Sequence, residues 1–341
     1  MTMHHDTNAT SASTTSTMTA ITQHRYGGPE VLEVATLPVP TPGPTDVLVT
    51  VHAAGLDRGT WHLMAGKPFV VRMMFGLRSP QRPVPGLDVA GVVAAVGDEV
   101  TRFAVGDEVF GIAQGSFAEF AVAPEAKLTN KPANVTFEQA AVVPVSGLTA
   151  YQAVHERGNV EAGQRVLVVG ASGGVGSFAV QIAAAAGAHV TGVASAAKHD
   201  LVRGLGAETV IDYAVTDIAQ LKERFDLIID VNGRTPVRAL RRLLTSHGTA
   251  VLVGGEGGSG PLGGAQRQML APLHALFRSQ TMVGMLSVED QGTIERLGEL
   301  LAAGTITPAI GEVYPLAEAP RAMADLISGT IRGKAAIRVA R

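Results

Sequence analysis

A short apolar run that stops at a cluster of glycines constrains this chain most. Residues 163–176 read Gly-Gln-Arg-Val-Leu-Val-Val-Gly-Ala-Ser-Gly-Gly-Val-Gly, and an apolar segment of helical character, 175–186, follows at once. A strand, a tight turn and a helix start, in this order, form the setting of a dinucleotide-binding loop. The helix N-terminus offers unpaired N–H groups and partial positive charge to a pyrophosphate, and glycines let the backbone come close. The sequence therefore predicts cofactor contacts from Ser172, Gly173, Gly174, Val175 and Gly176.

Beyond about residue 140, short apolar runs alternate with helices that have an apolar face. Strands alternating with helices predict a parallel sheet covered on both faces. Six strands is the number of a Rossmann fold. The predicted strands are Val166–Val169, Val190–Val193, Val210–Ile211, Leu227–Val231, Thr249–Val253 and Met282–Leu286, and the helices include Val175–Ala186, Lys198–Leu205, Pro236–Leu244 and Gln291–Ala303. The stretch Gly254–Leu276 predicts a loop and a helix near the mouth of the site.

The segment 20–122 has a different texture, with short strands and dense glycine and proline. Residues 46–53 alternate, with Val47, Val49 and Val51 on one face and Leu48, Thr50 and His52 on the other. Many short strands at such spacing predict a compact β domain. The segment 310–341 returns to short strands with a helix at 317–328, and we expect it to rejoin this first domain.

Composition limits the classes of function. The chain has 341 residues, of which 46% are hydrophobic and 17% charged, so we expect about two domains with large cores. The net charge of −3 provides no basic excess for a nucleic acid or an anionic membrane. Cysteine is absent, which excludes disulfides, thiolate–metal sites and a cysteine nucleophile. No apolar run reaches the roughly 18 residues of a membrane-spanning helix.

Residues 1–18 are rich in Thr, Ser and Asn and contain no Lys or Arg. A secretory signal needs a positive start and an apolar middle, and a mitochondrial one needs arginines. We therefore predict a disordered tail and a cytoplasmic location.

Several motifs, in order, resemble the medium-chain dehydrogenase/reductase superfamily, and most of all its zinc-free quinone oxidoreductase-like branch. They are Arg-Tyr-Gly-Gly-Pro-Glu at 25–30, Pro-Gly-Leu-Asp-Val-Ala-Gly-Val-Val at 85–93, the glycines and Phe103 within 96–109, Gly-Ser-Phe-Ala-Glu-Phe at 115–120, Ser-Gly-Leu-Thr-Ala at 146–150 and Gly-Lys at 333–334. The resemblance implies an α/β fold. A GroES-like catalytic β domain (19–140 and 288–341) accompanies a Rossmann NADP-binding domain (141–287) with a doubly wound parallel sheet, and the active site lies in the cleft between them.

The same resemblance indicates whether the active site can hold a metal ion. In zinc-dependent alcohol dehydrogenases of this superfamily, two cysteines and a histidine hold the catalytic zinc. Their places fall here on Asp57, Leu87 and a position near Val142. Leucine and valine have no donor atom, whereas catalytic zinc needs about three protein ligands. We therefore predict no metal, and hydride transfer without Lewis-acid help.

The absence of an acidic residue after the second strand indicates which nicotinamide cofactor is bound. In NAD-binding folds an Asp or Glu about twenty residues past the glycine loop holds the ribose 2′-hydroxyl. Here the corresponding stretch reads Val-Ala-Ser-Ala-Ala-Lys, so Ser195 and Lys198 can bind a 2′-phosphate instead. Tyr213 stands where the quinone reductase branch places a tyrosine near that phosphate. The sequence therefore predicts NADPH.

Further cofactor contacts are predicted at strand ends, because ligands of doubly wound sheets lie over the carboxyl ends of strands. They are Asn232 after the fourth strand, Gly254 and Gly255 after the fifth, and Met285, Leu286 and Ser287 after the sixth. Ser146 is expected near the nicotinamide, because family members place a Ser or Thr there.

Candidate catalytic residues cluster in the segment 57–62. The branch usually has Asn at the position of Asp57 and Asp at that of Thr60, so this chain departs at both. His62 lies where some zinc dehydrogenases carry a proton-relay histidine, and imidazole suits that role near neutral pH. A merely structural histidine and proton delivery by water stay open. The apolar residues Trp61, Phe69, Met73, Met74 and Phe75 could form a substrate wall or ordinary core.

These features predict an NADPH-dependent reductase of small-molecule quinones or α,β-unsaturated carbonyls. Two alternatives stay open, namely an enoyl-thioester reductase and an NADPH-binding redox sensor without catalysis. The sixth strand is an apolar edge, and since relatives pair two such edges, we expect a homodimer.

Overall fold

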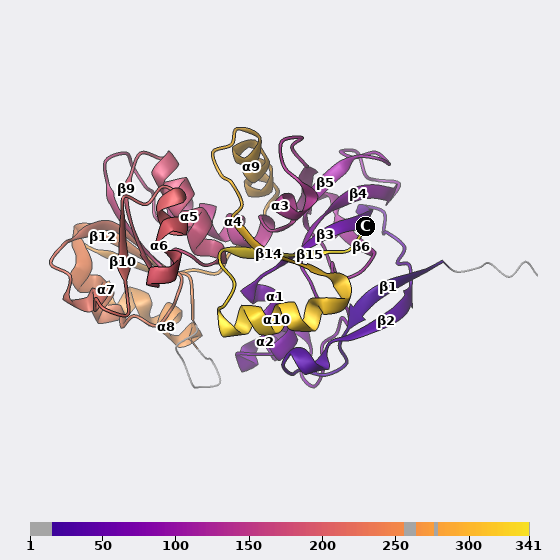
Figure 1. The fold of residues 1–341 in the computed structure, drawn as a ribbon, viewed down its shortest axis with the longest axis horizontal. Helices are drawn as coiled ribbons and strands as arrows, with labels where there is room; N and C mark the ends of the chain where they lie inside the picture. Colours follow the sequence, from indigo (N-terminus) through magenta and orange to yellow (C-terminus); the bar gives the residue numbers. More distant parts are fainter. Residues whose placement is uncertain (1–15, 256–263, 276–278, 341) are drawn as a thin grey trace, which may run out of the picture.

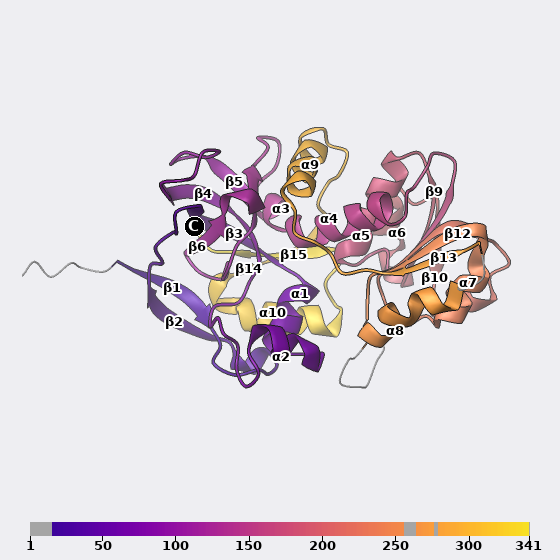
Figure 2. The same ribbon diagram turned by 180° about the vertical axis from the view of Figure 1, so that it is seen from behind.

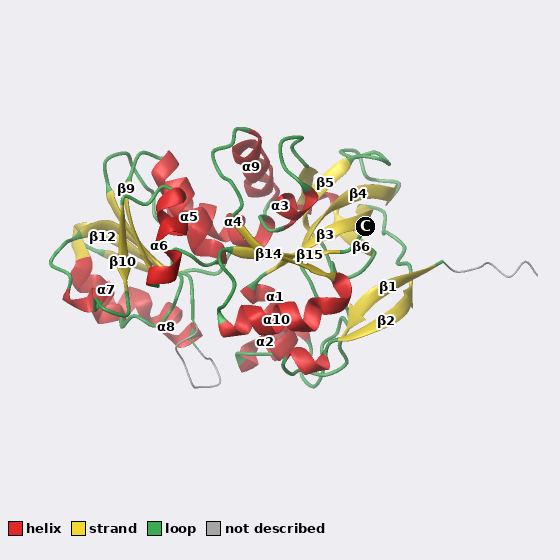
Figure 3. Ribbon diagram, in the orientation of Figure 1, coloured by secondary structure: helices red, strands yellow, loops and turns green. Residues whose placement is uncertain are grey.

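Two main β-sheets organise the protein. The computed structural model describes residues 16–255, 264–275 and 279–340. A parallel sheet flanked by helices lies at the left of Figure 1, and a strand-rich part lies at the right. Figure 3 shows the same division by secondary structure. The predicted α/β class, with a strand-rich domain beside a parallel sheet, is confirmed.

The parallel sheet has the six expected strands. They are β8 (Arg165–Val169), β9 (His189–Ala194), β10 (Thr209–Asp212), β11 (Phe225–Asp230), β12 (Leu244–Leu252) and β13 (Thr281–Gly284). Their order is β10-β9-β8-β11-β12-β13, and every neighbouring pair is parallel. The predicted bounds differ from the structure at every strand, and most at two of them: β12 begins at Leu244 rather than Thr249, and β13 ends at Gly284 rather than Leu286.

Both faces of this sheet are buried, as the apolar strands predict. Val166 and Val168 of β8 belong to the larger core cluster, together with Phe178. Leu167 and Val169 point to the other face and belong to a second cluster. The helices associated with the sheet are α4 (Pro144–Tyr151), α5 (Gly174–Ala185), α6 (His199–Gly204), α7 (Val237–Leu243) and α8 (Ala265–Leu270).

The strand-rich part contains a seven-stranded sheet and a separate hairpin. The hairpin is β1 (Thr17–Thr22) with β2 (Glu33–Pro38); the sheet contains β3 (Asp46–Leu56), β4 (Asp88–Val96), β5 (Glu108–Ile112), β6 (Phe120–Pro124), β7 (Leu128–Asn130), β14 (Ile310–Pro315) and β15 (Lys334–Arg338). The order is β14-β15-β3-β4-β5-β7, and β6 pairs with β3. The alternation predicted for β3 is confirmed, because Val47, Val49 and Val51 share one core cluster.

The remaining helices connect these strands. They are α1 (Arg58–Ala65), α2 (Phe69–Phe75), α3 (Phe137–Ala141), α9 (Gln291–Ala302) and α10 (Ala319–Ser328). No helix in the described ranges is long and apolar enough to cross a lipid bilayer.

The C-terminal segment returns to the strand-rich sheet. β15 pairs antiparallel with β3, so that Ala335 lies opposite Leu56, and β14 pairs with β15 in parallel. Figure 2 shows this yellow segment from behind, with β14, β15 and α10 in the strand-rich part of the molecule. Lys334, the first residue of β15, is thereby placed where the two parts of the molecule meet.

Candidate active site

The glycine turn connects β8 to α5, and the N–H groups of Gly170 and Ala171 donate to the Val193 oxygen (3.2 and 3.0 Å). Gly170 has a φ of 90°, which favours glycine, and a Cβ on Gly176 would lie 2.1 Å from the Gly170 carbonyl oxygen. Gly173 is the N-cap of α5 and makes no side-chain cap. A Cβ on Gly173 would meet only the Gly170 oxygen, at 3.4 Å. The turn therefore leaves uncapped helix N–H groups and free space beside them, which suits a phosphate.

The loops that follow three neighbouring strands lie together beside this turn. A Cβ on Gly170 would lie 3.4 Å from the Asn232 nitrogen, and one on Gly254 would lie 1.9 Å from the Val231 oxygen. The structure thus brings Asn232 and Gly254 to the same edge of the sheet as the glycine turn. Part of the predicted loop after Gly255 lies outside the described residues.

The segment after β13 differs from the expectation. Met285 donates its backbone N–H to the Leu252 oxygen (3.0 Å), and its side chain is buried in the larger core cluster. Leu286 is 83% exposed. The prediction that the sixth strand continues through Leu286 was wrong, because Met285 makes the last backbone hydrogen bond to the neighbouring strand β12. Ser287 is exposed in the loop beyond.

A pair of cations lies at the carboxyl end of β9. Lys198 donates to the backbone oxygens of Gly329 (3.2 Å) and Ile331 (2.8 Å). Burial, and then the positive charge of Arg332, lower the pKa of Lys198. Arg332 was missed from the sequence, and within the described residues it has no ion-pair partner. Ser195 directly follows β9 and precedes Lys198 in the same loop. Tyr213, which follows the neighbouring strand β10, is 60% exposed.

The candidate catalytic residues begin helix α1. Asp57 is its N-cap: one carboxylate oxygen accepts the Thr60 N–H (2.8 Å) and the other accepts the Thr60 hydroxyl (3.2 Å). Both side chains are buried. His62 lies apart from them, with its Nδ1 2.7 Å from the Lys67 carbonyl oxygen. The structure brings Asp57 and Thr60 together and gives His62 a backbone partner of its own.

Two buried charges that sequence reasoning did not single out lie beside Asp57. Asp88 is fully buried; its Oδ1 accepts the Val145 N–H (2.8 Å), and its Oδ2 has no hydrogen-bond partner. Lys334 Nζ lies 4.0 Å from that Oδ2 and donates to Ser146 Oγ (2.9 Å) and to the Leu56 oxygen (3.1 Å). Burial, reinforced by the negative charge of Asp57, raises the pKa of Asp88 well above its usual range, against the opposing charge of Lys334.

This polar cluster touches the glycine turn. A Cβ on Gly174 would lie 3.1 Å from Ser146 Oγ and 3.2 Å from Lys334 Cδ. Ser146, a predicted cofactor contact, is therefore held between the turn and a buried ammonium group. One signal in the sequence could have found the cluster, since Asp88 and Lys334 are charges at the start of apolar strand sequences.

The three places where zinc dehydrogenases carry ligands hold one carboxylate, Asp57, and two hydrocarbon side chains, Leu87 and Val142. Val142 is fully buried. Among the residues the structure describes, no group of three His, Cys, Asp or Glu side chains is arranged to hold a metal. The donor atoms present thus do not fit a catalytic zinc site.

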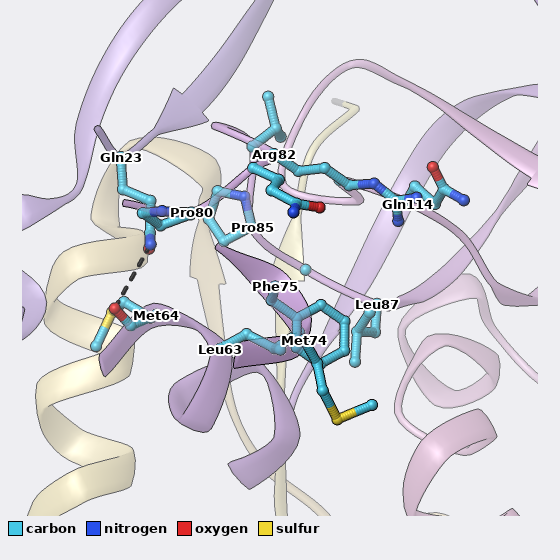
Figure 4. A pocket seen from close by; sticks show the side chains of 14 residues that line it. Gln23, Leu63, Met64, Met74, Phe75, Pro80, Arg82, Pro85, Leu87 and Gln114 are labelled. Carbon is cyan, nitrogen blue, oxygen red and sulfur yellow. Dashed lines mark hydrogen bonds between the residues drawn. The ribbon is translucent and has the colours of Figure 1, made fainter. Parts of the chain in front are cut away.

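A cavity of about 230 Å³ lies next to this cluster. Figure 4 shows Leu63, Met74 and Phe75 on one side, with Arg82 and Gln114 on the other. Leu87, the residue before Asp88, also lines it. The apolar candidates thus lie in different places. Met74 and Phe75 line the cavity, Trp61 packs on a core cluster, and Phe69 and Met73 are 48% and 71% exposed.

Comparison with known proteins identifies the family. Residues 43–133 match the model of the alcohol dehydrogenase GroES-like domain, and residues 205–337 match that of a zinc-binding dehydrogenase. A chloroplast envelope quinone oxidoreductase homolog of Arabidopsis thaliana is 31% identical, over 93% of this chain and 97% of its own. The chain belongs to the medium-chain dehydrogenase/reductase superfamily, as a quinone oxidoreductase-like member.

Solved structures agree with this assignment. The quinone oxidoreductase of Coxiella burnetii superposes with a TM-score of 0.81 at 28% identity, covering 95% of this chain and all of that one. A mycobacterial protein solved in complex with NADPH superposes with a TM-score of 0.79 at 29% identity, covering 94% of this chain and 100% of its own.

Proposed function

We propose that this protein is a zinc-independent oxidoreductase that transfers hydride from NADPH to quinones or other α,β-unsaturated carbonyls. The observation that carries the proposal is the open glycine turn at the carboxyl ends of the strands, with a polar cluster and an apolar cavity next to it. The quinone oxidoreductases among its relatives support an oxidoreductase with a nicotinamide cofactor.

The residues present fit a nicotinamide dinucleotide. The uncapped N–H groups after Gly173 would hold the pyrophosphate, and Ser146, beside Gly174, would contact the nicotinamide end. When bound, the reduced nucleotide supplies a hydride. The chain's own contribution is to orient the acceptor against it and to keep water out of the contact.

The pair of cations after β9, Lys198 and Arg332, supports NADPH over NADH as the cofactor. Burial, and then repulsion by the positive charge of Arg332, lower the pKa of Lys198. A 2′-phosphate between them would relieve this repulsion, and Ser195 offers a further hydrogen bond. The loop at the end of β9 contains no carboxylate that would reject a phosphate, since it reads Ser-Ala-Ala-Lys.

The acceptor class follows from the cavity and the ligand chemistry. Quinones and enones take hydride at an electrophilic carbon and need little Lewis-acid help, which matches a site without three metal donors. The cavity wall of Leu63, Met74 and Phe75 suits an apolar ring. Its volume of about 230 Å³ favours a compact acceptor over a long acyl chain, and so a quinone or short enone over an enoyl thioester.

The test is NADPH oxidation against a panel of acceptors. We expect turnover with naphthoquinones and short enones, and falling rates as enoyl thioesters lengthen. No acceptor-dependent oxidation of NADPH would contradict the catalytic proposal and favour the sensor. Rates that rise with acyl length would favour the thioester reductase.

Cofactor choice is tested separately by titration. We expect NADPH to bind at least about tenfold more tightly than NADH, a gap of roughly 1.4 kcal/mol. Lys198→Ala and Arg332→Ala should each remove most of this gap and leave NADH affinity unchanged. Lys222→Ala, which removes an exposed lysine elsewhere, is the matched control. Equal affinities of the unchanged protein for the two nucleotides would contradict NADPH preference.

We also infer a homodimer and a cytoplasmic location. The dimer is supported by the edge position of β13 in the parallel sheet. The cytoplasmic location is an expectation that fractionation of cells expressing the full chain would test.

A further inference from the structure

Three ionisable side chains are buried together at the junction of the two sheets. Asp57 is 4% exposed, Asp88 is not exposed and Lys334 is 2% exposed. If all three were ionised, the cluster would hold one net negative charge in the protein interior. Burying an uncompensated charge is costly, and proteins avoid it by shifting a proton onto the group. One carboxyl group of the cluster is therefore expected to be a neutral acid.

Hydrogen bonding distinguishes the two carboxyl groups. Asp57 accepts two hydrogen bonds from Thr60 and caps α1, so each of its carboxylate oxygens has a donor. Asp88 accepts one, from Val145, and its Oδ2 has none. The pKa of Asp88 is raised by its burial, by Asp57 and by Glu289, and is lowered by Lys334. Asp88 is thus the group that holds the proton.

A row of polar groups connects Asp88 to the glycine turn. Asp88 Oδ2 is 4.0 Å from Lys334 Nζ, which is 2.9 Å from Ser146 Oγ. That hydroxyl lies against Gly174, at the start of α5. The gap of 4.0 Å is longer than a hydrogen bond, but the lysine side chain is flexible, and such contacts often tighten only when a ligand is bound.

We propose that Asp88, Lys334 and Ser146 form a proton line that serves acceptor reduction, an inference that rests on the proposed function. After hydride reaches the acceptor carbon, the acceptor oxygen carries a negative charge and takes the Ser146 hydroxyl proton. Ser146 regains a proton from the Lys334 ammonium, and Lys334 regains one from the Asp88 carboxyl. Asp88 is reprotonated from water when the product leaves. One hydride and one proton are added in all. Ser146 touches the acceptor, whereas Lys334 and Asp88 are positioning residues.

The first test needs neither cofactor nor turnover. Infrared spectra of the ligand-free protein at pH 7 should contain the carbonyl stretch of a protonated carboxylic acid that is missing from Asp88→Asn. Ser146→Ala should keep this band, because it leaves Asp88 and Lys334 in place. If the spectra of the unchanged protein and of Asp88→Asn do not differ in this band, Asp88 is ionised and the proton line is overturned.

The second test uses kinetics with the acceptor found active. Ser146→Ala and Lys334→Met should lower kcat by about 10²-fold, with KM for the nucleotide little changed. Asp88→Asn should remove the fall of kcat at alkaline pH that loss of the Asp88 proton causes, leaving a low, flat profile. Lys334→Arg should retain much of the activity, since it keeps a cation beside Ser146.

The control is Lys131→Met, which removes a half-buried lysine of the strand-rich part that pairs with Glu108 at 3.0 Å. Its kcat and pH profile should match those of the unchanged protein. Unaltered kcat in both Ser146→Ala and Lys334→Met would overturn the proton line while leaving the proposed reductase intact. A protein that reduces no acceptor would instead contradict the reductase, and the infrared spectra would still decide the state of Asp88.

Discussion

At the residue scale, two glycines of one turn have different surroundings. A Cβ on Gly173 meets one atom at 3.4 Å, whereas a Cβ on Gly176 meets the Gly170 oxygen at 2.1 Å. We expect Gly173→Ala to change stability by less than about 1 kcal/mol, because its φ of −84° suits alanine. It should weaken NADPH binding at least about tenfold, because the methyl group takes space needed by the phosphate.

Gly176→Ala is the contrasting variant. It should lose roughly 1–3 kcal/mol of unfolding free energy through overpacking, as measured by urea titration. Calorimetric titration with NADPH completes the comparison. Unchanged NADPH affinity in Gly173→Ala would mean that the pyrophosphate does not lie over this turn.

At the element scale, one hydrogen bond ties α10 to β14. The Tyr314 hydroxyl donates to the Asp325 carboxylate (2.9 Å), and burial, followed by that bond, raises the pKa of Tyr314 to about 12. Because the folded pKa lies above the unfolded value of 10.0, this bond stabilises the fold below pH 10 and its contribution is lost as the pH rises towards 12. Tyr314→Phe should therefore cost about 1 kcal/mol at pH 7.

Urea unfolding at several pH values would measure this difference, which should narrow above pH 10. Tyr213→Phe is the control, because that ring is 60% exposed. A constant difference between Tyr314→Phe and the unchanged protein up to pH 12 would contradict the assignment.

At the scale of the whole molecule, an apolar surface surrounds the β13 edge. Met269, Leu273, Leu286 and Val288 are each at least 60% exposed near the end of the parallel sheet. Such a surface beside an open strand edge invites association. We expect light scattering to give a mass of two 35.2 kDa chains, and Met269→Glu with Leu273→Glu to give one. Val215→Glu, at the opposite edge, should stay dimeric. A monomeric unchanged protein would contradict the dimer.

The parts that sequence alone predicted are those that depend on local pattern. The glycine turn and the six strands are read from short apolar runs and adjacent glycines. The Lys334 contacts with Ser146 and Leu56 join residues 188 and 278 positions apart, and the bond from Lys198 to the Ile331 oxygen joins residues 133 positions apart. These contacts exist only because β15 pairs with β3, which periodicity in β15 cannot reveal. The bounds of β12 and β13 depend on partner strands for the same reason.

The late position of β15 also orders events during protein synthesis. A chain still on the ribosome that ends before Lys334 already contains every residue of the glycine turn, yet it lacks the ammonium that faces Ser146 and the strand that covers β3. The buried cluster is completed by a strand made 188 residues after Ser146. A nascent polypeptide therefore cannot assemble this centre until β15 has emerged and paired with β3.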